Sequence, residues 1–361
     1  MSEEEIVGVH SIPMADRKRS ASGILRTSSQ HTPITDAVAA APYIVEEEVV
    51  KEFFTVAPSG LVQPEDTLDR VTQFVHDHVA RGNRVVIITS GGTTVPLEKN
   101  TVRFLDNFSG GGRGSASVEY FIESGYAVIF LHRKNSLQPY QRHFMLLKDD
   151  QFLDYLQWDD NINSIKVQSD NQKIKTMLQR YHKAKSEHKL LKISFSTIHE
   201  YLYLLKEVSE RIRVAKSAGL VYVAAAVSDF YLPSAKMVEH KIQSIKGPLD
   251  LTLDPVPKML GALKHHWVPR AFVVSFKLET DYSILHYKAT QSLERYGHHL
   301  VIGNLLQNYR NEVFLYDDAK SSEPTSRMTR SEEEMKSNAD LEKEIIDQVV
   351  SRHTLHIELN Q

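Results

Sequence analysis

One stretch of the chain packs a strand, two glycine clusters, a helix and a second strand into close succession. A β-branched run at 85–89 is typical of a buried parallel strand. Two glycines follow at 91–92, where a backbone turns tightly or approaches a ligand closely. A second glycine cluster at 110–114 opens a helical pattern over 115–124, and an apolar strand at 126–131 closes the unit. This order predicts a nucleotide-binding crossover, in which backbone N–H groups and a helix N-terminus hold phosphate.

Strands and helices alternate through the remainder of the sequence. Further strands are expected at 190–195, 221–226, 272–276, 300–302 and, as an edge strand, 313–316; helices are expected at 68–81, 171–188, 197–218, 283–296 and 341–352. This alternation predicts an α/β fold, Rossmann-like, with three αβα layers around a mostly parallel sheet. A helical insertion near 144–204 and a flap after Pro233 are expected to decorate that body.

The sequence divides into three expected regions. Residues 1–35 are polar, lack a sustained apolar period and predict a disordered tail. Residues 36–82 predict N-terminal helical segments, and 83–361 predict the nucleotide-binding domain with its insertion.

Composition excludes several functional classes. A net charge of −3 and 41% hydrophobic residues are ordinary for a globular chain and argue against a nucleic-acid surface. The absence of cysteine excludes a thiol nucleophile, a disulfide and a thiolate metal site. No apolar run approaches the ~20 residues of a membrane span, and no signal-peptide core is visible, so no membrane association is expected. The expected compartment is the cytoplasm, and the nucleus is left open as a second one.

Arg103 and Asn107 lie four residues apart on the connection between the two glycine clusters. An arginine fork suits a carboxylate or a phosphate, and a neutral amide can donate to a developing oxyanion. The alternative is a loop with an ordinary surface arginine and a turn-forming asparagine.

Several motifs resemble one enzyme family. They are SGGT (90–93), PLE (96–98), VRFLDNFS (102–109) with the glycine-arginine run, AAAVSDFY (224–231), HKIQS (240–244), SFKLETD (275–281) and VIGNLL (301–306). In this order they resemble phosphopantothenate–cysteine ligase, over roughly 83–316. HKIQS and SFKLETD resemble the eukaryotic, monofunctional form, and the tail and central insertion resemble fungal members more than animal ones.

The resemblance implies a reaction and its participants. The expected activity is ATP-dependent ligation of 4′-phosphopantothenate and L-cysteine through an acyl-adenylate, giving phosphopantothenoylcysteine, AMP and pyrophosphate in coenzyme A biosynthesis. ATP and Mg²⁺ are the expected cosubstrate and ion. A homodimer with a shared site is expected, and the decarboxylase that follows in the pathway is a speculative second partner.

The resemblance also assigns roles to individual residues. The expected catalytic residues are Asn107, Lys241 and Arg103, and the expected substrate-binding residues are Asn107, Ala225, Ala226 and Asp229. The nucleotide is expected to contact Gly91, Ser109, Gly111, Gly114, Phe276, Lys277 and Asn304. No metal bound by protein side chains is expected, because the 17 histidines show no metal-ligand spacing. The alternative for Asp229 is a helix N-cap beside ordinary packing, and a flap lysine such as Lys241 is normally a solvated side chain.

Two other functions compete with the ligase. Tyr181 and Lys185 form a YxxxK pair preceded by Ser169, and Arg133 ends a strand where a 2′-phosphate could bind, which would suit an NADP-dependent oxidoreductase. Against it, the helix around Tyr181 is strongly polar and the glycine loop has a different internal sequence. A non-catalytic relative of the ligase would be expected to lose Asn107, Lys241 or Asp229, and all three are present.

Overall fold

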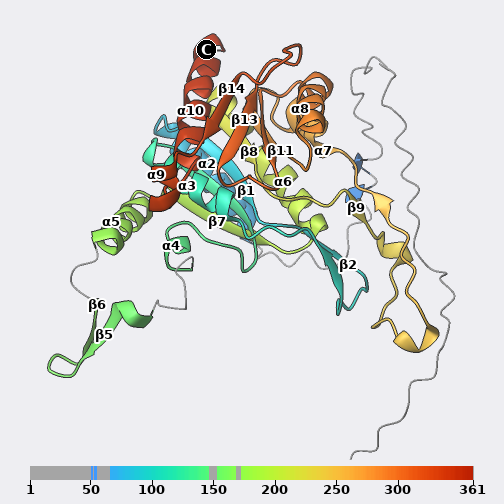
Figure 1. The fold of residues 1–361 in the computed structure, drawn as a ribbon, viewed down its shortest axis with the longest axis horizontal. Helices are drawn as coiled ribbons and strands as arrows, with labels where there is room; N and C mark the ends of the chain where they lie inside the picture. Colours follow the sequence, from blue (N-terminus) through green and yellow to red (C-terminus); the bar gives the residue numbers. More distant parts are fainter. Residues whose placement is uncertain (1–49, 52, 55–65, 146–152, 168–171, 361) are drawn as a thin grey trace, which may run out of the picture. The chain divides into compact units, whose positions relative to one another are not determined.

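The computed structural model describes residues 50–51, 53–54, 66–145, 153–167 and 172–360 (Figure 1). The predicted tail at 1–35 lies outside these residues, as does Ser169. Of the first part of the region at 36–82, where helical segments are expected, residues 50, 51, 53 and 54 are described and are helical.

An eight-stranded sheet forms the centre of the fold, in the order β14-β13-β12-β11-β8-β1-β4-β7. Six strands run parallel: β1 (Val85–Ser90), β4 (Ala127–Arg133), β7 (Leu190–Phe195), β8 (Gly219–Val223), β11 (Phe272–Glu279) and β12 (Leu300–Leu305). The chain builds outward from β1 to β4 and β7, then returns to the other side of β1 for β8. The sheet therefore has its switch point between β1 and β8, where open α/β sheets bind ligands.

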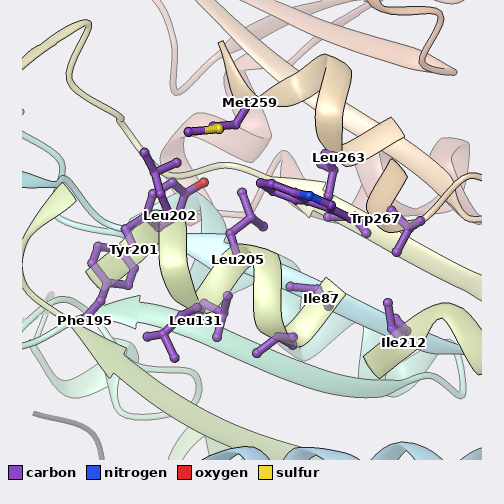
Figure 2. Packing of buried hydrophobic residues seen from close by; sticks show 14 of the residues in the cluster. Ile87, Leu131, Phe195, Tyr201, Leu202, Leu205, Ile212, Met259, Leu263 and Trp267 are labelled. Carbon is purple, nitrogen blue, oxygen red and sulfur yellow. The ribbon is translucent and has the colours of Figure 1, made fainter. Parts of the chain in front are cut away.

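Helices cover both faces of this sheet. One face is covered by four of the described helices: α2 (Thr67–Ala80), α6 (Ile198–Ile212), the short α7 (Met259–Ala262), which continues as the π-helix η6 (Leu263–Trp267), and α8 (Tyr282–Tyr296). Figure 2 shows side chains of α6 lying between Ile87 and Leu131 of the sheet and Leu263 and Trp267 of η6. On the other face lie α3 (Gly112–Glu123), α5 (Gln172–Ser186) and α10 (Glu342–Leu359).

The alternation of strand residues explains the two cores. Val85 and Ile87 enter the core with α2 and α6, whereas Val86 and Ile88 enter the core with α3 and α10. A strand buried on both sides must be apolar throughout, and all six residues of β1 are buried. The three-layer αβα fold predicted from the sequence is confirmed.

Several elements differ from the sequence prediction at the sheet edge. The strand expected at 313–316 is β13 (Glu312–Tyr316), and it is not an edge strand, because β14 (Ser326–Thr329) pairs antiparallel with it. β14 has four residues, of which only Met328 is apolar and buried, so it carries no apolar period. The strand expected at 221–226 ends at Val223, and the helix expected at 197–218 ends as α6 at Ile212 and continues as the 3₁₀ helix η3 (Arg213–Ala218).

Three small antiparallel pairs were not anticipated. β2 (Thr94–Pro96) pairs with β3 (Phe104–Asp106), β5 (Leu156–Asp159) with β6 (Ser164–Val167), and β9 (Phe230–Tyr231) with β10 (Asp254–Pro255). The remaining short helices are α4 (Arg142–Met145), α9 (Glu332–Ser337), η2 (Leu153–Tyr155), η4 (Ser234–Lys236) and η5 (Ser244–Lys246). Within the described ranges, every helix is too short or too polar to cross a lipid bilayer.

Candidate functional site

The loop after β1 lies at the switch point and is joined to the segment after β8 by backbone hydrogen bonds. Ala226 N donates to Gly91 O at 2.9 Å, and Thr93 N donates to Ala226 O at 3.0 Å. The Ala225 N–H donates to Thr89 Oγ1 at 3.1 Å. The predicted substrate residues Ala225 and Ala226 and the predicted nucleotide residue Gly91 therefore share one edge of the sheet.

Gly91 and Gly92 are required by close backbone approach. Gly91 has φ +86°, and a Cβ there would lie 2.6 Å from the Cβ of Arg133. At Gly92 the added carbon would lie 1.6 Å from the carbonyl oxygen of Asn107. The loop that carries Asn107 thus lies directly against the end of β1, in a space that only glycine leaves open.

The first turn of α3 also packs on the end of β1. Its N-cap, Gly111, has φ +79°, and the Ser90 hydroxyl donates to its carbonyl at 3.1 Å. A Cβ on Gly114 would lie 2.4 Å from the Ser90 side chain. The N-cap glycine has no side chain to cap this helix. Apart from the Gly111 N–H, which donates to Ser109 Oγ at 3.4 Å, the N–H groups of the first turn have no capping side chain in the described part of the chain. Such a helix end favours a phosphate.

Asn107 is held by two contacts of its loop. Its N–H donates to Thr93 O at 3.1 Å, and the preceding Asp106 pairs with the Arg133 guanidinium at 2.6 Å. Ser109, two residues on, accepts from Gly111 N at 3.4 Å. Arg133, considered for a 2′-phosphate, is therefore paired with a carboxylate of its own chain.

Arg103 lies at the junction between the β2–β3 hairpin and the flap, which we define as residues 232–253. Its guanidinium donates to Glu98 Oε1 at 2.9 Å and to Ile242 O at 3.0 Å. Lys241, the residue before Ile242, is solvent-exposed on the flap.

Asp229 immediately precedes β9, beside the flap. Its carboxylate lies 2.5 Å from Lys258 Nζ, and its side chain is 72% exposed. It does not cap a helix, so the alternative N-cap interpretation is wrong. The predicted substrate residue keeps a solvent-accessible carboxylate whose charge Lys258 balances.

The nucleotide residues predicted on β11 and β12 lie on neighbouring strands. Phe276 packs edge-to-face on Tyr222 at 5.0 Å, and the Arg113 guanidinium lies 5.7 Å from its ring centre. Burial lowers the pKa of Lys277, and Glu279 lies 4.0 Å from its ammonium. Asn304 is buried on β12, opposite Leu278.

Two residues that sequence analysis did not single out hold this site together. Arg113, in the first turn of α3, links Phe276 to Glu342 at 3.1 Å. Glu98 is fully buried and accepts hydrogen bonds from hairpin and flap. In the sequence, both residues lie inside motifs of the family resemblance, GGGRG (110–114) and PLE (96–98). A charged residue that interrupts small or apolar residues could have indicated them.

The oxidoreductase pair lies elsewhere. Tyr181, on α5, packs edge-to-face against Tyr140 at 5.8 Å, in the helical layer rather than at the strand ends. In the described ranges, no group of three or more His, Asp or Glu side chains is arranged to hold a metal ion.

Comparison with known proteins adds four similarities: one family model, two relatives and one solved structure. A family model described as the DNA/pantothenate metabolism flavoprotein C-terminal domain matches residues 184–352. Phosphopantothenate–cysteine ligase 2 of Oryza sativa subsp. japonica is 44% identical over 321 residues, which are 86% of this chain and 94% of the relative. Phosphopantothenate–cysteine ligase CAB2 of Saccharomyces cerevisiae is 37% identical, covering 91% and 95%. A solved structure of a Cab2 variant in complex with phosphopantothenate-cysteine superposes with a TM-score of 0.75 at 39% identity, covering 86% of this chain and 99% of that one.

Proposed function

Because this chain belongs to the phosphopantothenate–cysteine ligase family, we propose that it joins 4′-phosphopantothenate to L-cysteine in coenzyme A biosynthesis. One observation carries the proposal beyond family membership. The uncapped N-terminus of α3, the Asn107 loop and the Ala225–Ala226 segment meet at the switch point of the sheet. A helix end that suits a phosphate and a residue with a neutral amide therefore lie beside a backbone segment with small side chains, and this arrangement supports the proposal.

The chemistry that fits these residues is activation by ATP. A carboxylate is a poor electrophile, so its oxygen attacks the α-phosphorus of ATP, a P–O bond to pyrophosphate breaks, and an acyl-adenylate forms. The cysteine amine then attacks the acyl carbon, loses a proton, and AMP leaves. This route uses no protein nucleophile, in agreement with a chain that has no cysteine.

Each predicted residue receives a role in this scheme. We assign the Asn107 amide to the activated carbonyl oxygen and the Lys241 ammonium to the charge that develops during transfer. Gly91, Ser109, Gly111 and Gly114 form the phosphate cradle with the first turn of α3. Ala225, Ala226 and Asp229 form the phosphopantothenate pocket; Phe276, Lys277 and Asn304 form the nucleotide side. Arg103 stays a predicted catalytic residue.

Mg²⁺ fits this site as an ion carried by the nucleotide. Three carboxylates near the strand ends already have cations: Asp106 has Arg133, Asp229 has Lys258, and Glu279 has Lys288. Mg²⁺ is commonly held through substrate phosphates and water with few protein ligands. Its contribution there is to neutralise triphosphate charge.

The product nucleotide tests the mechanism. AMP and pyrophosphate are expected in equal amounts with phosphopantothenoylcysteine, whereas ADP and phosphate would refute the acyl-adenylate. Asn107→Ala is expected to lower turnover about a hundred- to a thousandfold while ATP still binds. Near-normal turnover of this variant would remove Asn107 from the catalytic residues and favour the non-catalytic interpretation of the loop.

The preference for ATP over CTP is a separate proposal. It rests on Gln243 and Ser244, which stand where the bacterial form carries more basic residues. Gln243 Nε2 donates to the carbonyl of Lys241 at 3.1 Å, so this side chain is folded onto the flap. Competition between equal ATP and CTP decides the choice, and a clear preference for CTP would overturn it without affecting the ligation.

We also propose a homodimer with shared sites. Large apolar side chains are exposed on and just after the β2–β3 hairpin, on β9 and on the flap; the hairpin and the flap hydrogen-bond to each other. Phe108 is 94% exposed and Ile245 is 92% exposed; the others are Val102, Phe104, Leu105, Phe230, Val238, Leu249 and Leu251. A concentration of this kind is typical of an association surface.

Complementation between inactive variants tests the shared site. If Asn107 of one subunit and Asp229 of the other meet in one site, mixing Asn107→Ala with Asp229→Ala restores one intact site per mixed dimer. Random exchange at equal amounts should then recover about a quarter of wild-type activity. No recovery despite confirmed subunit exchange would place both residues in the same subunit's site.

A further inference from the structure

Glu98 is a buried charge between the two segments that carry the proposed catalytic side chains. Its side chain is fully buried, yet it lies in a loop between β2 and β3. A carboxylate loses its hydration when buried, so it persists only where hydrogen bonds replace the water.

Four hydrogen bonds supply that replacement. Oε2 accepts from the backbone of Val102 at 3.1 Å and of Arg103 at 2.9 Å. Oε1 accepts from Arg103 Nη1 at 2.9 Å and from the backbone N–H of Ile242 at 3.3 Å. Three donors come from the hairpin and one from the flap, 144 residues away along the chain.

Ile242 is thereby fixed through both of its backbone polar groups. Its N–H donates to Glu98, and its carbonyl accepts from Arg103 Nη1 at 3.0 Å. Four residues earlier, Val238 O accepts from Lys99 N at 3.0 Å, and Glu239 O accepts from Asn100 N at 3.1 Å. The flap is held on both sides of Lys241.

The same hairpin leads directly to Asn107. β3 ends at Asp106, and the next residue begins the loop that lies against Gly92. We propose that Glu98 is a positioning residue, which fixes the flap segment that carries Lys241 relative to the hairpin that carries Asn107. The catalytic role of Lys241 in this inference rests on the proposed function. The contact of Glu98 with the flap does not depend on it.

The charge state of Glu98 supports this role. Hydrogen bonds, first from the Arg103 backbone and then from Ile242 and Val102, outweigh burial and lower the pKa of Glu98 to about 2. The side chain is therefore an acceptor only, at every pH at which the enzyme would work. Glutamine has the same shape, but its NH₂ group would face an N–H donor.

Amide hydrogen exchange tests the contact without any substrate. Glu98→Gln is expected to speed exchange at the Ile242 and Arg103 amides by about tenfold or more, because a hydrogen bond to a charged acceptor is lost. Glu239→Gln is the matched control, since Glu239 joins the same two segments through Lys99 but is 57% exposed. The control should leave exchange at Ile242 unchanged.

Kinetics test the consequence. Glu98→Gln is expected to lower kcat by about 10- to 100-fold with a smaller effect on KM for ATP, because Lys241 is displaced. The kcat of the double variant Glu98→Gln with Lys241→Ala should lie no more than about twofold below that of Lys241→Ala alone, since both changes remove the same contribution of Lys241. Multiplying losses, or unchanged exchange at Ile242, would overturn the proposal.

The outcomes separate this proposal from the proposed function. Full activity of Lys241→Ala would refute the role of Lys241, while exchange at Ile242 would still decide whether Glu98 holds the flap. Should Glu98→Gln fail to fold, Arg103→Lys weakens the same junction from the exposed side. Exchange at Ile242 then remains the deciding measurement.

Discussion

Substituting Gly92 with alanine tests how tightly the Asn107 loop is fixed. Gly92 has an ordinary φ, so the added methyl meets no backbone strain of its own. It would lie 1.6 Å from the Asn107 carbonyl oxygen and 2.8 Å from its carbon. Since C···O contacts seldom fall below ~3.3 Å, the Asn107 peptide must move by about 1.7 Å.

The size of the effect follows from that displacement. Overpacking by one carbon typically costs about 1–3 kcal/mol, and losing the hydrogen bond from Asn107 N to Thr93 O adds about 1 kcal/mol. The expected destabilisation is about 2–4 kcal/mol, or a Tm lowered by roughly 4–8 °C. Moving the amide by more than 1 Å should lower kcat/KM by about 100-fold.

Thermal unfolding and steady-state kinetics measure both effects. Gly110→Ala is the control for stability, because a Cβ there meets no atom within 4 Å and Gly110 has no positive φ. It should keep or slightly raise the Tm. A Gly92→Ala protein with unchanged Tm and turnover would refute the close approach of the Asn107 loop.

Two further predictions concern stability and the neighbouring ion pair. Burial lowers the pKa of His353 to about 4, so protonation favours the unfolded chain and stability falls as pH drops from 6.5 toward 4. Between pH 6.5 and 5.5 this histidine should contribute a loss of about 1 kcal/mol, because the unfolded chain is only half protonated at its pKa and the limiting slope of about 1.4 kcal/mol per pH unit is reached only below it. Denaturant titration at the two pH values should show this contribution to be absent in His353→Gln. The Arg133–Asp106 pair is partly exposed, 21% and 34%, so a double-mutant cycle with Arg133→Met and Asp106→Asn should give a coupling under about 1 kcal/mol. A tenfold rise in KM for the nucleotide in Arg133→Met alone would instead assign Arg133 to the ligand.

Local signals in the sequence were sufficient for the central fold. β7 was predicted with the bounds observed, 190–195, because its flanking polar residues end the apolar run on both sides. β14 was missed because SRMT is short and has a single buried apolar residue, and the hairpin β2–β3 because its strands have three residues each and one contains Pro96. Strands of that length carry too few residues for a period to be seen.

In the candidate site too, some features could be predicted from the sequence and others could not. The glycines at 91, 111 and 114 could be predicted because a positive φ or a close backbone approach is a local demand that only glycine meets. The partners of Glu98 and Asp229 could not, since Ile242 lies 144 residues from Glu98 and Lys258 lies 29 from Asp229. No periodic pattern records which side chains a three-dimensional fold will bring together.

The contacts of α10 determine when the side of the sheet covered by α3 can finish folding during synthesis. Arg113 pairs with Glu342, and Tyr126 with His353, across 229 and 227 residues of chain. At a translation rate of about 5–20 residues per second, roughly 10 to 45 s separate the two ends of each contact. Val118 and Phe121 of α3 share a core with Ile345 and Ile346 of α10, so this apolar surface stays uncovered for that interval. The glycine loop is made early on the ribosome, but its helix acquires its permanent covering only after α10 has emerged, so we expect the nascent chain to expose an apolar surface of the kind that chaperones bind during this interval.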